Sequence, residues 1–179
     1  QAKRVGVGAE LLENGRDALQ QLQQHEREAR AAGLRTAKAP TPRTEGDLGE
    51  DIRSVVTALE PRAAAARVNV ASIIPEPVAA LRDSEAIQLI LHNLLENAIK
   101  HSPPETKVEV ELTADATLAR IVVRDQGRGL DPQELAHAFE PFWRGSDSVT
   151  GGSGLGLHLV RQLVEAHGGS VDAKSNGRG

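Results

Sequence analysis

The chain has 179 residues, no cysteine and a net charge of −4, with lysine and arginine distributed among the acidic residues. This length suffices for one core plus an appendage, and the lack of cysteine excludes disulfide bonds and thiolate metal sites. The mildly negative charge argues against nucleic acid or an anionic membrane as the main partner, and no apolar run approaches the roughly 20 residues of a membrane-spanning helix.

The first predicted element is a helix over residues 9–32. Leu12, Leu19 and Leu22 form a narrow apolar stripe along it, which is typical of a helix in a bundle or coiled coil. Two glycines and two prolines in "GLRTAKAPTPRTEG", residues 33–46, predict a linker. The first quarter of the chain therefore reads as an appendage that precedes a globular domain.

The rest of the chain alternates between helical and strand-like patterns. In chain order, the predicted elements are a helix over 48–66, a strand over 68–74, a helix ending near 101 and capped by Asp83 or Ser84, strands over 107–112 and 118–125, a short helix over 132–138, a Gly/Ser-rich loop over 145–154, a helix over 155–167 and a strand over 169–175. Helices mixed with mostly antiparallel strands predict an α/β sandwich with helices over one face of the sheet.

The long helix carries the motif "HNLLENAIKH", residues 92–101, and presents three faces on a helical wheel. The face expected in the core consists of Ile87, Leu91, Leu94 and Ala98. The face expected in solvent consists of Glu85, Gln88, His92 and Glu96. The third face consists of Asn93, Asn97 and Lys100, with His101 at its edge.

The third face is unusual because asparagine is only a mediocre helix former and a solvated face does not need it. An amide oxygen is a good neutral ligand for a hard cation such as Mg²⁺. A lysine one turn further along can meet a phosphate as a point charge. The pattern fits a metal and phosphate site, and an ordinary polar stripe is the alternative.

Two glycine motifs follow, and each has a plainer interpretation. "DQGRGL", residues 125–130, ends a strand with a carboxylate that could accept a hydrogen bond from an exocyclic amine, although Asp-x-Gly also forms ordinary turns. "GGSGLGLHLV", residues 151–160, places glycines at alternate positions where a helix begins, which suits phosphate binding. A flexible linker is the alternative there, but a linker would not run directly into an apolar helix.

All three aromatic residues lie in "FEPFWRG", residues 139–145. The rings alone predict a simple hydrophobic cluster. Arg144 stands beside the Gly/Ser-rich loop and is better placed than the rings to meet a phosphate.

In this order and spacing, the four motifs resemble the N, G1, F and G2 boxes of the catalytic ATP-binding domain of bacterial sensor histidine kinases. The resemblance runs from about Leu48 to Gly179. It implies the Bergerat fold, a two-layer α/β sandwich with a mixed sheet covered by helices on one face, shared with gyrase, heat-shock chaperone and mismatch-repair ATPases. The domain would be preceded by a helix of a dimerisation hairpin.

The resemblance also implies a role for each motif residue. Asn97 would coordinate Mg²⁺, and Asn93 would support it. Phosphate would be contacted by Lys100 and Arg144. His101 would pack near the adenine. Asp125 would accept the adenine amino group, and Gly127 and Gly129 would let the purine approach. The other nucleotide-binding residues would be Leu130, Gly152, Ser153, Gly154, Leu155, Gly156 and Leu157, beneath a lid over residues 145–153.

One position separates kinases from hydrolases within this superfamily. The related hydrolytic ATPases carry a glutamate, which activates water, at the place of Asn93. An amide cannot act as a general base. The resemblance therefore implies a site that holds ATP while an outside nucleophile attacks the γ-phosphate, so that transfer rests on positioning and charge stabilisation.

The chain departs from the complete family pattern at both ends. The acceptor motif is missing, because His25-Glu26 lacks the rest of it, and the family's last strand beyond "SNGRG" is absent. We therefore expect a piece of a longer protein. Residues 1–32 would hold the second hairpin helix, 33–47 a linker and 48–179 the catalytic domain.

The implied partners are ATP or ADP, the phosphoacceptor hairpin of the same kinase dimer and a cognate response regulator, with no nucleic acid. We expect a cytoplasmic fragment that does not autophosphorylate, from a homodimeric parent kinase anchored in the bacterial inner membrane. The alternatives are a stand-alone ATPase or serine kinase of the same superfamily and a degenerate nucleotide-binding module.

Overall fold

The computed structural model describes residues 6–9, 43–75, 77–145 and 154–177. The helices are α2 (Leu48–Ala66), α3 (Ser84–His101), α4 (Pro132–His137) and α5 (Gly156–Ala166). The strands are β1 (Gly6–Ala9), β2 (Thr44–Asp47), β3 (Asn69–Ile73), β4 (Ala79–Arg82), β5 (Lys107–Ala114), β6 (Ala119–Arg124) and β7 (Ser170–Lys174). Across these residues, no helix combines the length and apolarity that crossing a membrane requires.

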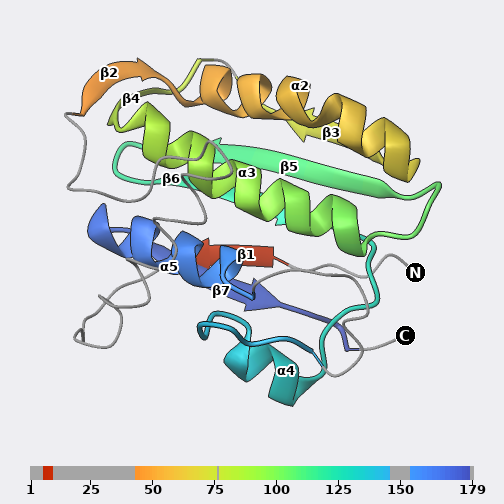
Figure 1. The fold of residues 1–179 in the computed structure, drawn as a ribbon. Coiled ribbons are helices and arrows are strands. Elements are labelled where there is room, and N and C mark those ends of the chain that lie inside the picture. The colour runs from red at the N-terminus through yellow and green to blue at the C-terminus, as the bar shows by residue number, and fades with distance from the viewer. Residues whose placement is uncertain (1–5, 10–42, 76, 146–153, 178–179) are drawn as a thin grey trace, which may run out of the picture.

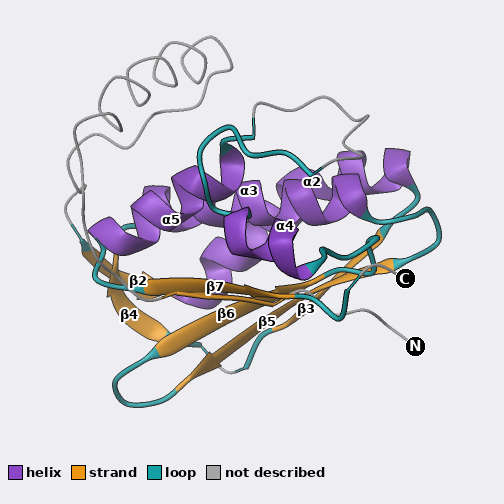
Figure 2. Ribbon diagram, turned by 90° about the horizontal axis from the view of Figure 1, so that it is seen from below, coloured by secondary structure: helices purple, strands orange, loops and turns teal. Residues whose placement is uncertain are grey.

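The strands form one layer, and the helices cover one of its faces (Figures 1 and 2). β5 pairs in parallel with β3 and antiparallel with β6. β1 pairs antiparallel with β7 and packs beside β6, and β2 pairs antiparallel with β4. This mixed sheet beneath a helical layer confirms the predicted two-layer α/β sandwich.

The predicted helices of the domain agree closely with the structure, because their ends carry local capping signals. The Asp47 side chain accepts a hydrogen bond from the Gly49 N–H at 2.9 Å where α2 begins. Of the two candidates for the start of α3, Asp83 is the cap and accepts from the Ala86 N–H at 3.0 Å.

Three short strands were not predicted. β2 lies at the end of the predicted linker, so the folded domain begins before residue 48. β1 lies within residues 1–32, which were assigned to the hairpin helix, whereas residues 10–32 of that helix are outside the described part of the chain. β4 was not predicted either, and it pairs with β2 through contacts such as Thr44 with Arg82. Such four-residue strands carry little periodic signal and depend on distant partners.

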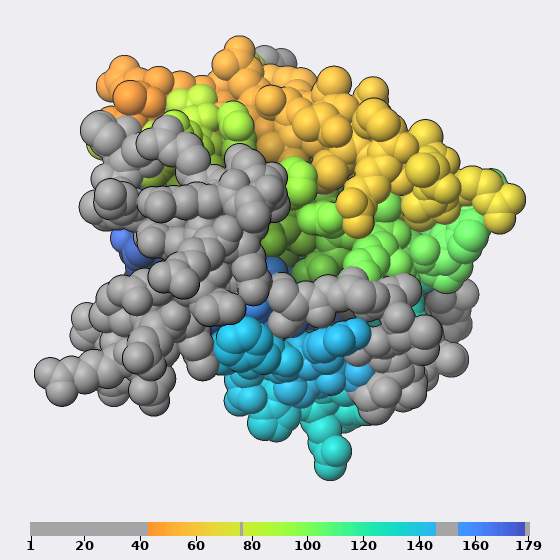
Figure 3. Space-filling view, in the orientation of Figure 1, coloured from red at the N-terminus to blue at the C-terminus, as the bar shows by residue number. Residues whose placement is uncertain are grey.

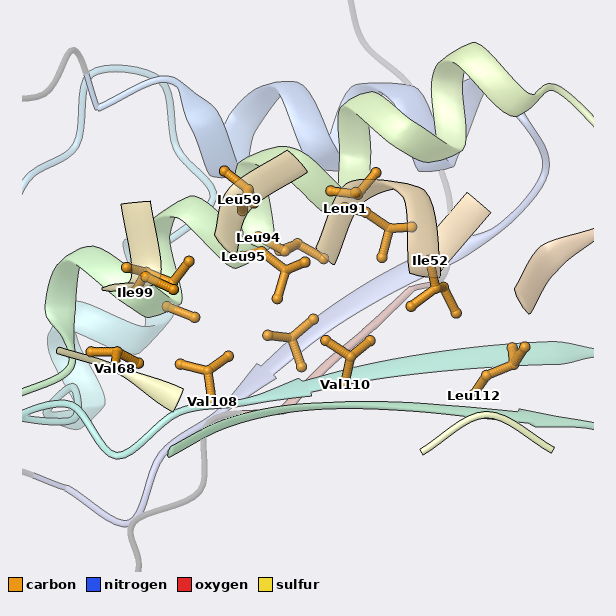
Figure 4. Close-up of a cluster of buried hydrophobic side chains, with 14 of the residues drawn as sticks. Ile52, Leu59, Val68, Leu91, Leu94, Leu95, Ile99, Val108, Val110 and Leu112 are labelled. Carbon is orange, nitrogen blue, oxygen red and sulfur yellow. The ribbon is translucent and has the colours of Figure 1, made fainter. Parts of the chain in front are cut away.

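The core lies between α2, α3 and the sheet (Figure 4). Its largest fully buried side chains include Ile52 of α2, Leu91 and Leu95 of α3, and Val108 and Val110 of β5. The predicted core face of α3 is confirmed at Leu91, Leu94 and Ala98, and Ile87 packs partly buried against the same cluster. The buried face is wider than predicted because α3 also packs Leu95 and Ile99 inward.

Glu85 is exposed as expected, but other residues of the face of α3 that was expected in solvent contact α2. Glu96 pairs with Arg62 of α2 at 2.8 Å. Gln88 donates to Asp51 of α2 at 3.4 Å, and Asp51 is buried in an ion pair with Arg82 of β4. The contacts of Asp51 hold the beginning of α3 against α2 and β4, and the Glu96–Arg62 pair joins its second half to α2.

A second polar contact joins α3 to α5. The buried carboxylate of Asp83, at the start of α3, lies 3.2 Å from His167 Nε2 at the end of α5. His167 O in turn accepts a hydrogen bond from Arg43 at 3.1 Å. The two helices that carry the asparagine and glycine motifs are thus tied together at the ends remote from those motifs.

Candidate functional site: a nucleotide pocket

A pocket of about 390 Å³ lies where the second half of α3, the loop after β6, the segment after α4 and the start of α5 meet. This volume falls in the usual range for small-molecule sites. Figure 3 shows this side of the molecule, with α3 between α2 and the segment around α4. The predicted site residues that line the pocket are Asn93, Asn97, Lys100, His101, Asp125, Gly127, Gly129, Leu130, Arg144, Gly154, Leu155, Gly156 and Leu157. Gly152 and Ser153 lie outside the described residues.

The asparagine face of α3 lies against the first residue of α5. Asn93 Nδ2 donates to the Leu89 carbonyl at 2.8 Å, which leaves Asn93 Oδ1 on the opposite side of the amide. A Cβ atom on Gly156 would lie 3.0 Å from Asn93 Oδ1 and 3.7 Å from Asn97 Nδ2. The two asparagines therefore adjoin the N-terminus of α5, where backbone N–H groups carry a partial positive charge.

Asp125 lies at the end of β6 on another wall of the pocket. Its Oδ1 accepts the Gly127 N–H at 2.7 Å, which leaves Oδ2 as a second acceptor. Burial raises the pKa of Asp125, and the hydrogen bond from Gly127 offsets part of this shift. The carboxylate is thus held in one orientation and partly desolvated, as expected of a group that recognises a single hydrogen-bond donor.

The glycines of the loop after β6 have a packing role that the sequence did not reveal. A Cβ on Gly127 would lie 2.8 Å from both Asp125 Oδ1 and the His101 carbonyl oxygen. Gly129 has a φ of 73°, and its Cβ would lie 2.4 Å from the carbonyl oxygen of Gly177. Protein atoms fill the space at both positions, so these glycines permit the loop itself to fold tightly around the pocket.

The charged side chains that line the pocket are mainly cationic. The cations are Arg62, Lys100, Arg128 and Arg144, and the carboxylates are Glu96 and Asp125. Glu96 is engaged by Arg62 at 2.8 Å. Burial, together with the positive charges of Lys100 and Arg128, lowers the pKa of His101, so this imidazole is neutral at physiological pH. The excess of positive over negative side chains in the pocket favours an anionic ligand.

The aromatic motif divides between core and pocket. Phe139 is buried, as predicted for a hydrophobic cluster, and the Arg161 guanidinium lies 4.6 Å from its ring centroid. Phe142 is 48% exposed and has a φ of 61°, and Trp143 lines the pocket. Gly154 packs so closely on this backbone that a Cβ would lie 2.7 Å from the Phe142 carbonyl carbon. The start of the glycine motif is thus held against the aromatic motif.

A family model described as "Histidine kinase-, DNA gyrase B-, and HSP90-like ATPase" matches residues 82–179, which include all four motifs. The chain belongs to this ATPase family. The resemblance read from the motifs is confirmed, and membership of the family implies that the domain binds ATP.

Individual relatives of this ATPase domain are bacterial sensor kinases. The histidine-protein kinase/phosphatase MprB of Mycolicibacterium vanbaalenii is 46% identical over 91 residues, 50% of this chain and 19% of that protein. The sensor histidine kinase TrcS of Mycobacterium tuberculosis is 35% identical over 144 residues, 71% of this chain and 28% of that protein. The chain therefore spans less than a third of the length of either relative.

Solved structures of histidine kinases share the fold of this ATPase domain. The mycobacterial sensor histidine kinase MprB aligns with a TM-score of 0.60 at 27% identity, covering 76% of this chain and 99% of that one. Full-length ShkA in complex with AMPPNP aligns with a TM-score of 0.66 at 25% identity, covering 89% of this chain and 35% of that one.

Three charged residues of the ATPase pocket were not predicted from the sequence. Arg128 could have been predicted, because it lies inside the motif "DQGRGL". Glu96 was assigned to solvent, and Arg62 lies on a different helix with no motif around it. Only the packing of α2 on α3 brings the last two to the pocket.

The contact between Gly156 and Asn93 leads to a testable expectation. We expect Gly156→Ala to lower the affinity for Mg-ATP roughly tenfold, because the added Cβ must displace Asn93 Oδ1, while the free energy of unfolding changes by no more than about 1 kcal/mol. Calorimetric titration and thermal unfolding measure the two effects. Gly169→Ala is the matched control, since its Cβ would meet Val164 at a similar 3.1 Å outside the pocket. Equal ATP affinities in the two variants would contradict the proposed contact.

Proposed function

We propose that this chain is the ATP-binding catalytic domain of a two-component sensor histidine kinase. It would transfer the γ-phosphate of ATP to a histidine on a dimerisation hairpin, for relay to a response regulator. The observation that carries the proposal is the convergence, in one pocket, of the amides of Asn93 and Asn97, the N-terminus of α5 and the carboxylate of Asp125.

Each group has a role that fits its chemistry. The fixed Asp125 carboxylate accepts the adenine amino group through Oδ2, and the neutral His101 lies beside the base. Asn97 would supply an amide oxygen to Mg²⁺, with Asn93 in support, and a bound Mg²⁺ would neutralise part of the phosphate charge. Lys100 and Arg144 contact phosphate oxygens. Amide and phosphate oxygens are the hard ligands that Mg²⁺ prefers, so the residues present fit this cofactor.

The same groups favour transfer to an outside acceptor over hydrolysis. Neither asparagine amide can take a proton from water, and Asp125 is engaged by Gly127 on the adenine side. An imidazole nitrogen of the acceptor would attack the γ-phosphorus while the bond to the bridging oxygen of ADP breaks. The pocket would accelerate this step by alignment and by stabilising charge on the phosphate oxygens.

The parent protein is part of the same proposal. Residues 10–32 would be the second helix of the hairpin, and the acceptor helix would come from the rest of the protein. The relatives named as histidine kinases support a sensor kinase as the parent. A homodimer, a cognate response regulator and an anchor in the bacterial inner membrane are further parts of this proposal.

Incubation with ATP labelled at the γ-phosphate tests the function. We expect the chain to bind Mg-ATP without phosphorylating itself, and to yield acid-labile phosphohistidine only when its acceptor hairpin is added in trans. Phosphate release by the chain alone, lost in Asn97→Ala, would favour the stand-alone ATPase. Acid-stable phosphoserine would favour a serine kinase, and acid-labile phosphate on His25 would show that the acceptor lies within the chain.

A further inference from the structure

Arg128 belongs to the loop after β6 and lines the nucleotide pocket, as Lys100 and Arg144 also do. Sequence analysis gave this residue no role. It stands between Gly127 and Gly129, whose tight packing against neighbouring backbone restricts the loop that carries it. A long cationic side chain on a restrained loop is well placed to meet a ligand.

The side chain of Arg128 is anchored by a buried carboxylate. Glu134 of α4 is only 6% exposed, and its Oε1 accepts a hydrogen bond from Arg128 Nη2 at 3.1 Å. Glu134 Oε2 accepts the Asp131 N–H at 3.1 Å, and the Glu134 N–H donates to Asp131 Oδ1 at 2.8 Å. This capping box fixes Oε2 and the backbone of Glu134, which leaves Oε1 directed at Arg128, so Glu134 is a rigid support and not a mobile counter-ion.

The backbone beside this pair leaves room for it. A Cβ on Gly145 would lie 2.3 Å from Arg128 Nη2 and 2.6 Å from Glu134 Oε1, so a larger residue there would overlap the ion pair. Gly145 follows Arg144 directly, and both line the pocket. The Arg128–Glu134 pair is therefore packed beneath the segment that carries the arginine already expected to meet phosphate.

The charge of Arg128 acts within the pocket. Burial is the largest cause of the lowered pKa of His101, and the positive charges of Lys100 and Arg128 add to it. The neighbouring carboxylate of Glu134 does not cancel this effect. A guanidinium has five N–H donors in a planar fork, so it can bond Glu134 and a phosphate oxygen at the same time.

We propose that Arg128 is a phosphate-contacting residue of the nucleotide site and that Glu134 is its positioning residue. The ligand is the polyphosphate of an adenine nucleotide, and the inference rests on the proposed ATP-binding function. Anchoring by Glu134 lowers the side-chain entropy that Arg128 loses when phosphate binds. Asp125 is held by Gly127 and Arg128 by Glu134. Because the two side chains have different partners, the positive charge of Arg128 does not compromise adenine recognition by Asp125.

The test compares the affinities of ATP, ADP and adenosine by calorimetry in the wild type, Arg128→Gln, Arg128→Lys and Glu134→Gln. We expect Arg128→Gln to weaken ATP and ADP roughly tenfold and adenosine less than about twofold, as for loss of one charge-assisted hydrogen bond. Arg128→Lys should restore part of the loss, because it keeps the charge without the fork. Arg120→Gln, an exposed arginine of β6 that does not line the pocket, is the control for loss of charge alone.

A double-mutant cycle separates positioning from a purely structural role of Glu134. Glu134→Gln should weaken ATP about threefold in the wild-type background and have no further effect on ATP once Arg128 is Gln. Equal losses in both backgrounds would overturn the positioning role. An unchanged ratio of ATP to adenosine affinity in Arg128→Gln would overturn the phosphate contact while leaving the ATP site intact. Failure of the wild type to bind any adenine nucleotide would instead overturn the proposed function together with this inference.

Discussion

Replacing Asn97 by alanine is expected to lower the affinity for Mg-ATP roughly 100-fold and the affinity for metal-free ATP no more than about threefold. The reason is that Mg²⁺ demands near-octahedral coordination, and loss of one oxygen ligand is not readily made good by water in a shaped pocket. Asn97 lies on the half-buried face of α3 that adjoins the N-terminus of α5, where phosphates would bind.

Calorimetric titration with ATP in Mg²⁺ and in EDTA measures this difference. Asn69→Ala is the matched control, because Asn69 is an exposed residue of β3 that does not line the pocket. Equal losses with and without Mg²⁺ would remove the metal role of Asn97 and leave it as a residue that contacts the nucleotide directly.

The second large effect is expected at Asp125. Asp125→Asn should weaken ATP, ADP and adenosine alike by roughly 100-fold, with or without Mg²⁺, because an amide can present a donor to the adenine amino group. For the same reason, nucleotide affinity of the wild type should fall as the pH is lowered through the raised pKa of Asp125. A loss confined to the phosphorylated nucleotides would contradict adenine recognition by Asp125.

The same substitution should stabilise the ligand-free domain at neutral pH. Burial raises the pKa of Asp125 above its usual value of 3.8, so the folded state binds this proton more tightly than the unfolded chain does. The resulting contribution to stability is complete at low pH and is lost as the pH rises through the folded pKa. Asparagine has no charge to desolvate, so the variant should melt at a higher temperature at pH 7, and the gain should vanish near pH 3.

Asp115→Asn is a control that should change the melting temperature at pH 7 in the opposite direction. The N–H of Thr117, followed by its hydroxyl and the N–H of Leu118, lowers the pKa of this exposed carboxyl. Its ionised form therefore favours folding above the unfolded pKa, and this contribution is lost as the pH falls through the folded pKa. Asp115→Asn should accordingly lower the melting temperature slightly at pH 7 and leave adenosine affinity unchanged.

The elements predicted well from sequence are those whose signals are local. α2 and α3 begin at aspartate caps and keep an apolar face at helical spacing, and β5 alternates between core and solvent. The polar face of Asn93, Asn97 and Lys100 follows from the same periodicity. Side chains three and four residues apart share a face of any α-helix, so this juxtaposition needs no knowledge of the fold.

What escaped the sequence depends on pairs of residues far apart in the chain. The strands β2 and β4 are four residues each and acquire their structure only by pairing with one another. Glu96 was expected in solvent because nothing local indicates that α2 brings Arg62 to it. The anchoring of Arg128 likewise requires that Glu134 of the α4 capping box and Gly145 both pack beside the Arg128 side chain.

The sequence by itself thus determined which chemical groups this protein presents: an amide and lysine face on one helix, a carboxylate beside glycines at a strand end, and a glycine-rich helix start. Only the tertiary structure decided how these groups meet. Gly156 must pack where a Cβ would lie 3.0 Å from Asn93 Oδ1, Gly127 must fit between Asp125 and His101, and Glu134 must reach Arg128. Backbone capping and helical periodicity act over a few residues, whereas the assembly of the pocket depends on packing between elements that are distant in sequence.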